Sequence, residues 1–294
     1  MTRPTIRTPL FSRHERTWRQ NRYVYPVISR RSGGLSIGIN LNPTKGCNFN
    51  CVYCCVDRSR PTGQRAISMD LIESELDEML GLAISGDLFK QPPFDQTPPP
   101  LRRLNDIAFS GDGEPTLCTR LPIAIELVAK LLLSRRLSDV KIVLITNATM
   151  LDCAAVQKSL ALLAQHNGEI WAKLDAGSME YYELIDRSQV SFHRVLRGLR
   201  HAAIAYGIVV QSMFLRYQGH GPTDQEIEAY LGRLHDILAA GGTIREVQVY
   251  TVARPPADRD VEMLDDASLD SIAKKIRAAG IPAEVFYGSP TDRR

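Results

Sequence analysis

Four of the chain's six cysteines lie within nine consecutive residues: Cys47, Cys51, Cys54 and Cys55. The first three are spaced C-x-x-x-C-x-x-C, and three thiolates in one short loop bind a soft metal or an iron–sulfur cluster. A structural zinc or a closed cluster takes four ligands, usually as two separated pairs, and this sequence has no second pair. Three ligands on a four-iron cluster leave one iron open to an exogenous ligand. The spacing therefore favours a reactive cluster over a structural one.

Two other arrangements of these thiols stay open. In one, Cys55 is the fourth ligand of a zinc knuckle, and in the other Cys55 takes the place of Cys54. Disulfides are not expected, because a cytoplasmic chain keeps its thiols reduced. The remaining cysteines, Cys118 and Cys153, stand alone in helical patterns and are expected to be small buried hydrophobic residues.

Short strand patterns alternate with helical patterns over most of the chain, from residue 34 onward. Strands are expected at 34–41, 106–110, 139–146, 169–174, 208–215, 246–251 and 284–287. Helices are expected from residue 70 and at 121–137, 151–166, 192–206, 223–240 and 268–279. The segment 91–103 contains five prolines, which remove donors and fix φ, and it predicts an irregular loop.

This alternation predicts right-handed crossovers and a parallel sheet. Six strand–helix units can be counted, fewer than the eight that close a full barrel. A partial barrel and a flat doubly wound sheet both fit this count. In either fold, sites form at the carboxyl ends of the strands.

Polar residues follow several of these expected strands. The segment 110–115, Ser-Gly-Asp-Gly-Glu-Pro, follows the second strand; its glycines allow close approach of a ligand, and Glu114 and nearby carbonyls accept hydrogen bonds from an ammonium group. Later strand ends carry Asn147, Lys173 and Asp175, and Gln211 and Ser212 lie in the fifth strand. Taken alone, each later residue fits an internally bonded polar group as well as a ligand contact.

Together these motifs resemble the radical S-adenosylmethionine (SAM) family. The cysteine triad with Tyr53 before its last member is similar to the family signature, and 110–115 resembles its Gly-Gly-Glu motif in the form G-x-G-E-P. The resemblance implies that Cys47, Cys51 and Cys54 ligate one four-iron four-sulfur cluster whose open iron is chelated by SAM. Reductive cleavage of SAM would give methionine and a 5′-deoxyadenosyl radical. The family's partial (β/α)6 barrel agrees with the six counted units.

The resemblance also implies where SAM binds. The glycine-rich motif would bind the methionine amine, and a carboxylate such as Asp175 suits the ribose hydroxyls. An ammonium such as Lys173 suits the SAM carboxylate. The residues expected to contact SAM are Tyr53, Ser110, Gly111, Asp112, Gly113, Glu114, Asn147, Lys173, Asp175 and Gln211.

Two segments resemble a narrower, single-cluster group related to the tRNA wyosine-base synthases. They are 29–54, which includes SIGINLNPTKGCNFNCVYC, and 249–256, VYTVARPP. Arg30, Arg31 and Arg254 in these segments are expected to form an anion pocket facing the radical, or else surface ion pairs and helix caps. The wyosine synthases carry a further cysteine set upstream, and no cysteine precedes residue 47 here. We therefore expect one cluster and do not expect wyosine formation.

Charge divides the chain unevenly. Residues 1–60 hold eleven basic and two acidic residues, whereas the remainder holds 25 basic and 31 acidic residues. A positive segment binds a polyanion such as RNA or an anionic small substrate, or it is a solvated arm. We expect a basic arm at 1–33, a radical SAM partial barrel at 34–254 and a carboxyl-terminal extension at 255–294.

Composition sets the class of protein. With 294 residues, 44% of them hydrophobic, the chain can bury a large core. No apolar run reaches membrane-spanning length, and arginines occupy the first twenty residues, so we expect a cytoplasmic protein without a membrane partner. The expected function is that of an oxidoreductase that abstracts hydrogen from an RNA base or a peptide.

An external one-electron reductant, of the flavodoxin or ferredoxin type, is the expected partner of such an enzyme. No catalytic acid or radical relay is assigned; Tyr53, Cys55 and Tyr250 are the candidates. The alternative function is that of a metal or iron–sulfur protein that binds RNA without catalysis.

Overall fold

The computed structural model describes residues 6, 8–12, 16–58 and 66–288. The chain forms two compact units, the first from residues 1–46, 61–144 and 162–169, and the second from 47–60, 145–161 and 170–294. The division falls within two strands, β4 (Lys141–Thr146) and β5 (Gly168–Lys173). The cysteine loop and the carboxyl ends of β4 and β5 therefore belong to the second unit.

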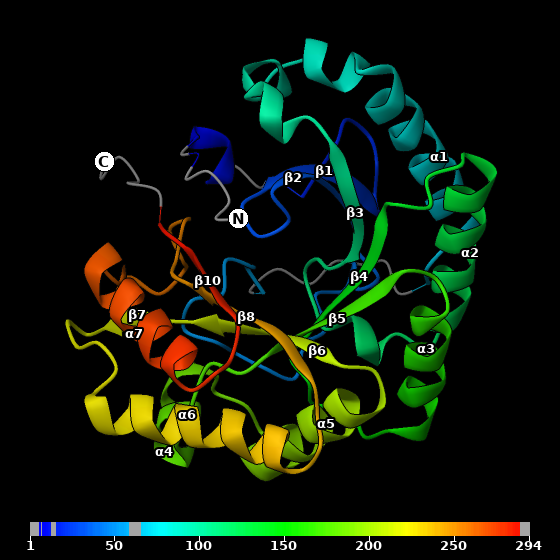
Figure 1. Cartoon of the computed structure of the whole chain (residues 1–294). Helices are drawn as coiled ribbons and strands as arrows, with labels where there is room; N and C mark the ends of the chain where they lie inside the picture. The colour runs from blue at the N-terminus through cyan, green and yellow to red at the C-terminus, as the bar shows by residue number, and fades with distance from the viewer. Residues whose placement is uncertain (1–5, 7, 13–15, 59–65, 289–294) are drawn as a thin grey trace. The chain divides into compact units, whose positions relative to one another are not determined.

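The first unit contains the strands β1 (Val24–Ser29), β2 (Gly34–Ile39), β3 (Leu104–Phe109) and the start of β4, in that order (Figure 1). β1 pairs antiparallel with β2, and the other pairs are parallel. β2 is buried along its whole length between β1 and β3. The ring of Tyr25 lies over Gly38, where an added Cβ would come within 2.3 Å of a ring carbon. Close packing of this kind fixes the register of the hairpin.

Two long helices accompany this sheet, α1 (Met69–Ser85) and α2 (Leu121–Ser134). α1 begins at Ser68, whose side chain accepts a hydrogen bond from Leu71 N, and ends at Gly86 in the left-handed region. The buried carboxylate of Glu75 accepts hydrogen bonds from the backbone N–H groups of residues 22–24. This contact ties the amino-terminal segment to α1.

The second unit contains β5, β6 (Ile208–Met213), β8 (Ile244–Tyr250) and β10 (Ala283–Phe286), paired in parallel in that order. A separate antiparallel pair is formed by β7 (Leu215–Tyr217) and β9 (Val261–Met263). Its helices are α4 (Met179–Ile185), α5 (Phe192–Ala205), α6 (Asp224–Ala239) and α7 (Asp266–Ala278) (Figure 1). The helix α3 (Ala154–Ala164) has its first eight residues in this unit.

Strand register arranges the side chains of the second unit in rows, because alternate residues of a strand face the same side. One row consists of Lys173, Gln211, Gln248 and Glu284. The next row toward the carboxyl ends consists of Met213, Tyr250 and Phe286. On the opposite face, the Ser212 hydroxyl bonds Tyr230 of α6 at 2.6 Å. The helices therefore cover one face and leave the two rows on the other.

The short helix α4 is held at its amino end by α6. Ser178 is its N-cap, and the Glu226 carboxylate of α6 accepts hydrogen bonds from Gly177 N, Ser178 N and the Ser178 hydroxyl. At the start of α6 the Thr223 side chain accepts a hydrogen bond from Glu226 N. The Glu226 side chain, which in a capping box would bond back to the N–H of Thr223, bonds α4 instead.

Several elements differ from the expectations. Val24–Ser29, inside the segment expected as a basic arm, forms strand β1. The proline-rich segment forms short 3-10 helices at Phe94–Gln96 and Pro99–Leu101. Cys118 and Cys153 lie in turns just before helices and are half-buried, so the expectation of buried helical cysteines was wrong. The boundaries expected at 33 and 254 stay predictions.

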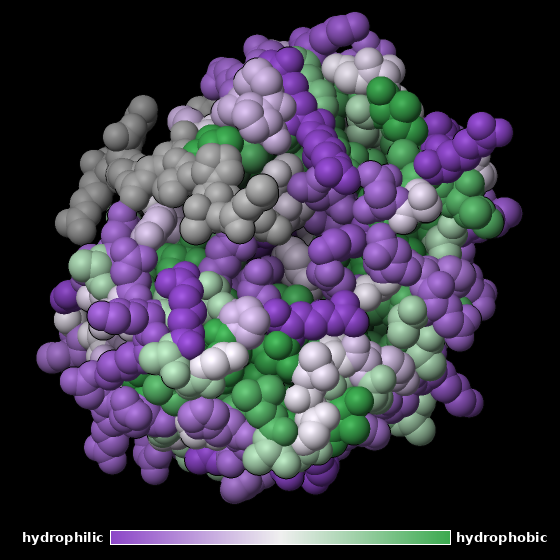
Figure 2. Space-filling model, in the orientation of Figure 1, coloured by the Kyte–Doolittle hydropathy of each residue, from purple (hydrophilic) through white to green (hydrophobic). Residues whose placement is uncertain are grey.

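Figure 2 shows a face on which hydrophilic residues predominate and hydrophobic residues appear in small groups. Among the described residues, no helix has both the length and the apolar composition needed to cross a bilayer.

Candidate functional site

The cysteine loop is anchored by the end of α4. Asn50 N donates to the Asp186 carbonyl at 3.0 Å, and Val52 N donates to the carbonyl of the last residue of α4 at 2.9 Å. The Ser188 hydroxyl donates to the Asn48 carbonyl at 2.7 Å. These three bonds fix the backbone of the loop on both sides of Cys51.

Aromatic packing supports the same contact. The ring of Phe49 meets Tyr182 of α4 edge to face at 5.7 Å, and Tyr182 stacks on Phe192 of α5 at 4.8 Å. The Tyr182 hydroxyl donates to the Val190 carbonyl at 2.8 Å, so its polar end is also satisfied. The loop is thus packed on α4, which is itself stacked on α5.

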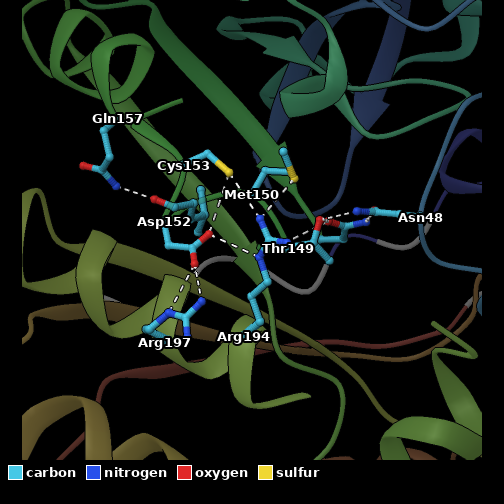
Figure 3. Close-up of polar contacts among 10 residues, drawn as sticks. Asn48, Thr149, Met150, Asp152, Cys153, Gln157, Arg194 and Arg197 are labelled. Carbon is cyan, nitrogen blue, oxygen red and sulfur yellow. Dashed lines mark hydrogen bonds and ion pairs between the residues drawn. The ribbon is translucent and has the colours of Figure 1, made fainter. Parts of the chain in front are cut away.

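A closed ring of side-chain hydrogen bonds joins the loop to the end of β4. Asn48 Nδ2 donates to the Thr149 hydroxyl, that hydroxyl donates to Asn147 Oδ1, and Asn147 Nδ2 donates to Asn48 Oδ1, each at 2.7 Å. Figure 3 shows Asn48 and Thr149 facing each other in this ring. Asn147, expected to contact SAM, therefore has a role in positioning the first cysteine.

Cys47, Cys51 and Cys54 are half-buried. Cys47 Sγ accepts from Phe49 N at 3.5 Å and lies 3.7 Å from Asn147 Nδ2. Each of the other two sulfurs also has a polar partner. Cys51 Sγ donates to Asp186 Oδ1 at 3.6 Å, and Cys54 Sγ accepts from Arg58 Nη1 at 3.3 Å.

This donor set fits a four-iron cluster. Within the part of the chain that the structure describes, no three His, Cys, Asp or Glu side chains are grouped so that they could hold one metal ion. A four-iron cluster does not need such convergence, because each thiolate binds a different iron. Cys55, the candidate fourth ligand of a zinc knuckle, is exposed and turns its thiol to the Tyr53 carbonyl at 3.7 Å. The arrangement favours a cluster on three thiols over a zinc knuckle.

A buried polar network lies beside Cys51. Lys173 Nζ donates to the hydroxyls of Tyr53 at 2.7 Å and Tyr250 at 3.4 Å. It also forms an ion pair with Asp175 at 3.7 Å. The Tyr53 hydroxyl donates to Asp175, whose other carboxylate oxygen accepts from Met213 N at 2.7 Å. The expected SAM contacts Tyr53, Lys173 and Asp175 are therefore brought together.

Burial and charge set the protonation of this network. Burial raises the pKa of the Tyr53 hydroxyl, and the Asp175 carboxylate raises it further. Burial by itself lowers the pKa of Lys173, but Asp175 together with Tyr250, Cys51 and Asp186 outweighs burial, and the pKa is raised. Burial also raises the pKa of the Cys51 thiol. The network thus holds a neutral tyrosine between an ammonium group and a carboxylate.

The interior row next to this network contains two buried amides. Gln211 Nε2 donates to Gln248 Oε1 at 2.8 Å, and both side chains are buried. Gln211 Oε1 has no hydrogen-bond partner among the described residues. A buried acceptor of this kind costs free energy until it is paired, which suits a contact with a bound molecule.

The glycine-rich motif lies in the first unit and closes on the residue before Cys47. Glu114 N donates to the Gly46 carbonyl at 2.9 Å, and Asn42 Nδ2 donates to the Glu114 carbonyl. A Cβ added at Gly113 would lie 2.0 Å from the Gly46 carbonyl oxygen. Only glycine permits this approach.

The other polar side chains of the motif already have protein partners. Glu114 accepts from Thr116 N at 3.1 Å and caps the short helix that follows. Ser110 bonds the Tyr25 hydroxyl at 3.1 Å, and Asp112 pairs with Arg16 at 2.8 Å. Contacts of these residues and of Gly111 with SAM stay predictions.

The three arginines of the expected anion pocket come from two different units. Arg30 and Arg31 form the turn before β2, at its amino end, whereas the cysteine loop follows its carboxyl end. Arg254 lies in the second unit. The anion pocket of all three arginines stays a prediction.

The contacts of Asp186, Ser188, Arg58 and Gln248 were not expected from the sequence. Asp186 is 135 residues from Cys51 and belongs to no motif. The contact of Arg58 could have been predicted from the sequence, because Arg58 follows Cys54 by only four residues and lies in the same loop.

The chain was compared with known proteins by sequence and by structure. No family model matches the sequence. A protein named GTPase Obg from Brachyspira hyodysenteriae is 25% identical over 99% of this chain, which spans 39% of that protein's length. A UPF0026 protein of Synechocystis is 28% identical over 88% of this chain and 94% of its own length. A UPF0026 protein of Helicobacter pylori is 24% identical over 83% and 70%.

Solved structures decide the fold. A radical SAM methyltransferase from Sphaerobacter thermophilus superposes with a TM-score of 0.58 at 15% identity, over 86% of this chain and 66% of that one. The fold is a radical SAM partial barrel. TYW1 with a lysine–pyruvate adduct superposes at 0.52 and 15% identity, over 84% of this chain and 74% of that one. Of the two folds expected from the sequence, the partial barrel is confirmed and the flat doubly wound sheet is not. At these sequence identities the likeness shows the fold and not the activity.

Proposed function

We propose that this protein is a radical SAM enzyme with one four-iron four-sulfur cluster on Cys47, Cys51 and Cys54. The observation that carries the proposal is the anchored loop that presents three half-buried thiols, each with a polar partner, within a radical SAM fold. Such a cluster, when bound with SAM, would pass one electron from an external reductant to SAM, giving methionine and a 5′-deoxyadenosyl radical that would take a hydrogen atom from substrate.

The chain's own residues bind and orient in this function. The hydrogen bonds that anchor the cysteine loop beside the end of α4 hold the thiols in place. The hydrogen-bonded ring of Asn48, Asn147 and Thr149 positions Cys47. The Tyr53–Lys173–Asp175 network places an ammonium and a carboxylate next to Cys51, where the carboxylate and hydroxyls of SAM would find partners. Gln211 offers an acceptor to the same interior space.

Water exclusion is the second contribution of the protein. An apolar cluster that includes Val52, Met213, Tyr250 and Phe286 packs against Cys51. A radical that abstracts hydrogen unselectively needs an environment that keeps solvent and other donors away. We place the chain, as part of this proposal, near the single-cluster group related to the wyosine-base synthases, supported by the likeness to TYW1. The substrate class is an RNA base or a peptide, and the reductant is a flavodoxin- or ferredoxin-type protein.

The test is anaerobic purification followed by iron and sulfide analysis and reaction with SAM. We expect about four irons per chain, broad absorption near about 400 nm from thiolate-to-iron charge transfer, and 5′-deoxyadenosine after addition of dithionite. Cys51→Ala should lose the absorption and the product, because three thiols are the minimum that hold the cluster.

Cys55→Ala is the matched control, because it removes the neighbouring exposed thiol. This variant should retain iron, absorption and 5′-deoxyadenosine formation. An intact cluster in Cys51→Ala, or a loss confined to Cys55→Ala, contradicts the ligand assignment. Zinc in place of iron in protein handled without oxygen contradicts the proposed function itself.

A further inference from the structure

Cys54 differs from the other ligand cysteines in the charge of its polar partner. Its Sγ lies 3.3 Å from Nη1 of Arg58, within hydrogen-bond distance for sulfur. Cys47 Sγ instead accepts from neutral N–H groups, and Cys51 Sγ faces a carboxyl group. A permanent positive charge therefore lies on one corner of the candidate site.

The geometry of the loop holds this contact in place. Arg58 follows Cys54 by four residues and is half-buried. The Cys54 carbonyl accepts from Ala257 N at 3.4 Å, which ties the backbone at this cysteine to the segment after β8. A guanidinium stays charged at all working pH values, and partial burial weakens the screening of its charge by salt.

A cation at a ligand sulfur stabilises the more negative of two redox states. Reduction adds one negative charge to a cluster with its thiolates, and hydrogen bonds and charges at the sulfurs shift the reduction potential of such clusters. The charge-assisted hydrogen bond acts through the sulfur, so Arg58 needs no contact with SAM or with substrate.

We propose that Arg58 is a positioning residue that holds the Cys54 sulfur and raises the reduction potential of the cluster. The proposal rests on the proposed function, since it requires a cluster on the three cysteines. Arg58 acts on the Cys54 sulfur through its charge. The neighbouring Cys55 has no such role, because its thiol is exposed and turned to a backbone carbonyl.

The experiment compares midpoint potentials of the full-length, anaerobically reconstituted protein, measured by redox titration monitored by electron paramagnetic resonance. Arg58→Gln should shift the midpoint to a more negative value than in the wild type. Arg58→Lys keeps the charge but not the planar fork, and should lie between the two. Release of iron to a chelator should be about tenfold faster in Arg58→Gln, the effect typical of removing a group that orients a metal ligand.

Arg245→Gln is the matched control. Arg245 belongs to the same unit but bonds the Tyr206 carbonyl at 2.9 Å instead of a cysteine. Its substitution should leave the midpoint and the iron release unchanged. An Arg58→Gln midpoint equal to that of the wild type, in protein with full iron content, overturns this inference alone. A wild-type protein that binds no iron–sulfur cluster overturns the proposed function and this inference with it.

Discussion

Gly113 controls how closely the glycine-rich loop approaches the residue before the first cysteine. A Cβ at this position would lie 2.0 Å from the Gly46 carbonyl oxygen and 2.7 Å from Cβ of Asn42. Backbone and a short side chain cannot move aside as the end of a long side chain can. The absence of one methyl group at residue 113 is therefore a condition for the hydrogen bond from Glu114 N to Gly46.

Gly113→Ala should lower the free energy of unfolding by about 1–3 kcal/mol, the usual cost of overpacking. It should also lower the iron content, because the displaced Gly46 is bonded directly to Cys47. Chemical denaturation and iron analysis measure the two effects. Gly81→Ala in α1 is the control: nothing lies within 4 Å of its added Cβ. That variant should gain up to about 1 kcal/mol in helix propensity, and equal losses in both variants would contradict the packing argument.

The three proposed ligand cysteines can be picked out from the sequence because they lie in one short loop with the spacing C-x-x-x-C-x-x-C. The partners of these thiols cannot be read in the same way. Asp186 and Asn147 reach the loop only through the fold, from 135 and 100 residues away. Arg30 and Arg31 precede β2 and the cysteine loop follows it, and the anion pocket expected from these arginines stays a prediction.

At the scale of elements, the loop that follows β4 is held between the cysteine loop and α5. Asn48 bonds Thr149 on one side, and on the other Asp152 accepts from Arg197 at 2.6 Å and pairs with Arg194 at 3.5 Å. Figure 3 shows both arginines converging on Asp152, with Cys153 beside them. The position of Asn147 therefore depends on how firmly α5 binds this loop.

Asp152→Asn should lower stability by about 1 kcal/mol at neutral pH, as expected for a partly exposed ion pair. Partial burial opposes ionisation of Asp152, but the Arg197 hydrogen bond and the Arg194 charge outweigh it and lower its pKa. A lowered carboxyl pKa gives stability that is complete above the unfolded value near about 4 and is lost as pH falls through the folded value. Unfolding in denaturant at several pH values should show the difference from wild type vanishing in acid.

Asp139→Asn is the control for this prediction. Asp139 pairs with Arg103 at 2.8 Å, but both side chains are about two-thirds exposed, at 65% and 68%. Its substitution should change stability by less than about 0.5 kcal/mol. A difference for Asp152→Asn that stays constant down to strongly acid pH would contradict the ionic origin of the effect.

The strands and helices that the sequence pattern predicts are the long, periodic ones. β1 escapes the pattern because Pro26 interrupts it, and proline is tolerated there because β1 is an edge strand. β7 and β9 have three residues each and α4 has seven, too few to establish a period. The helix α4, which anchors the cysteine loop, is thus one of the elements that the sequence periodicity could not predict.

At the scale of the whole molecule, neither unit is a continuous stretch of chain. The boundaries between the units fall after residues 46, 60, 144, 161 and 169, so the chain passes from one to the other five times. The apolar cluster of the second unit joins Val52 and Tyr53 from the cysteine loop to Met213, Tyr250 and Phe286. No single cut separates either unit from residues that complete its core.

A fragment of residues 170–294 should therefore not fold as an independent domain. It contains the strands of the second unit except the end of β4, but it lacks the segments 47–60 and 145–161. We expect weak far-ultraviolet circular dichroism per residue and no cooperative thermal transition, in contrast to the full chain. A cooperative transition in the fragment would show that the cysteine loop is dispensable for this core.

The bonds that Glu226 makes at the start of α4 have a mechanical consequence. α4 has seven residues and so acts as a stiff rod about 10 Å long. One end is fastened by the Glu226 carboxylate at Gly177 and Ser178, and the other end carries the backbone contacts of the cysteine loop at Asp186. A rod fastened at one end transmits any tilt to the other. How rigidly Cys51 is held thus depends in part on the Glu226 carboxylate of α6, which bonds only the opposite end of α4.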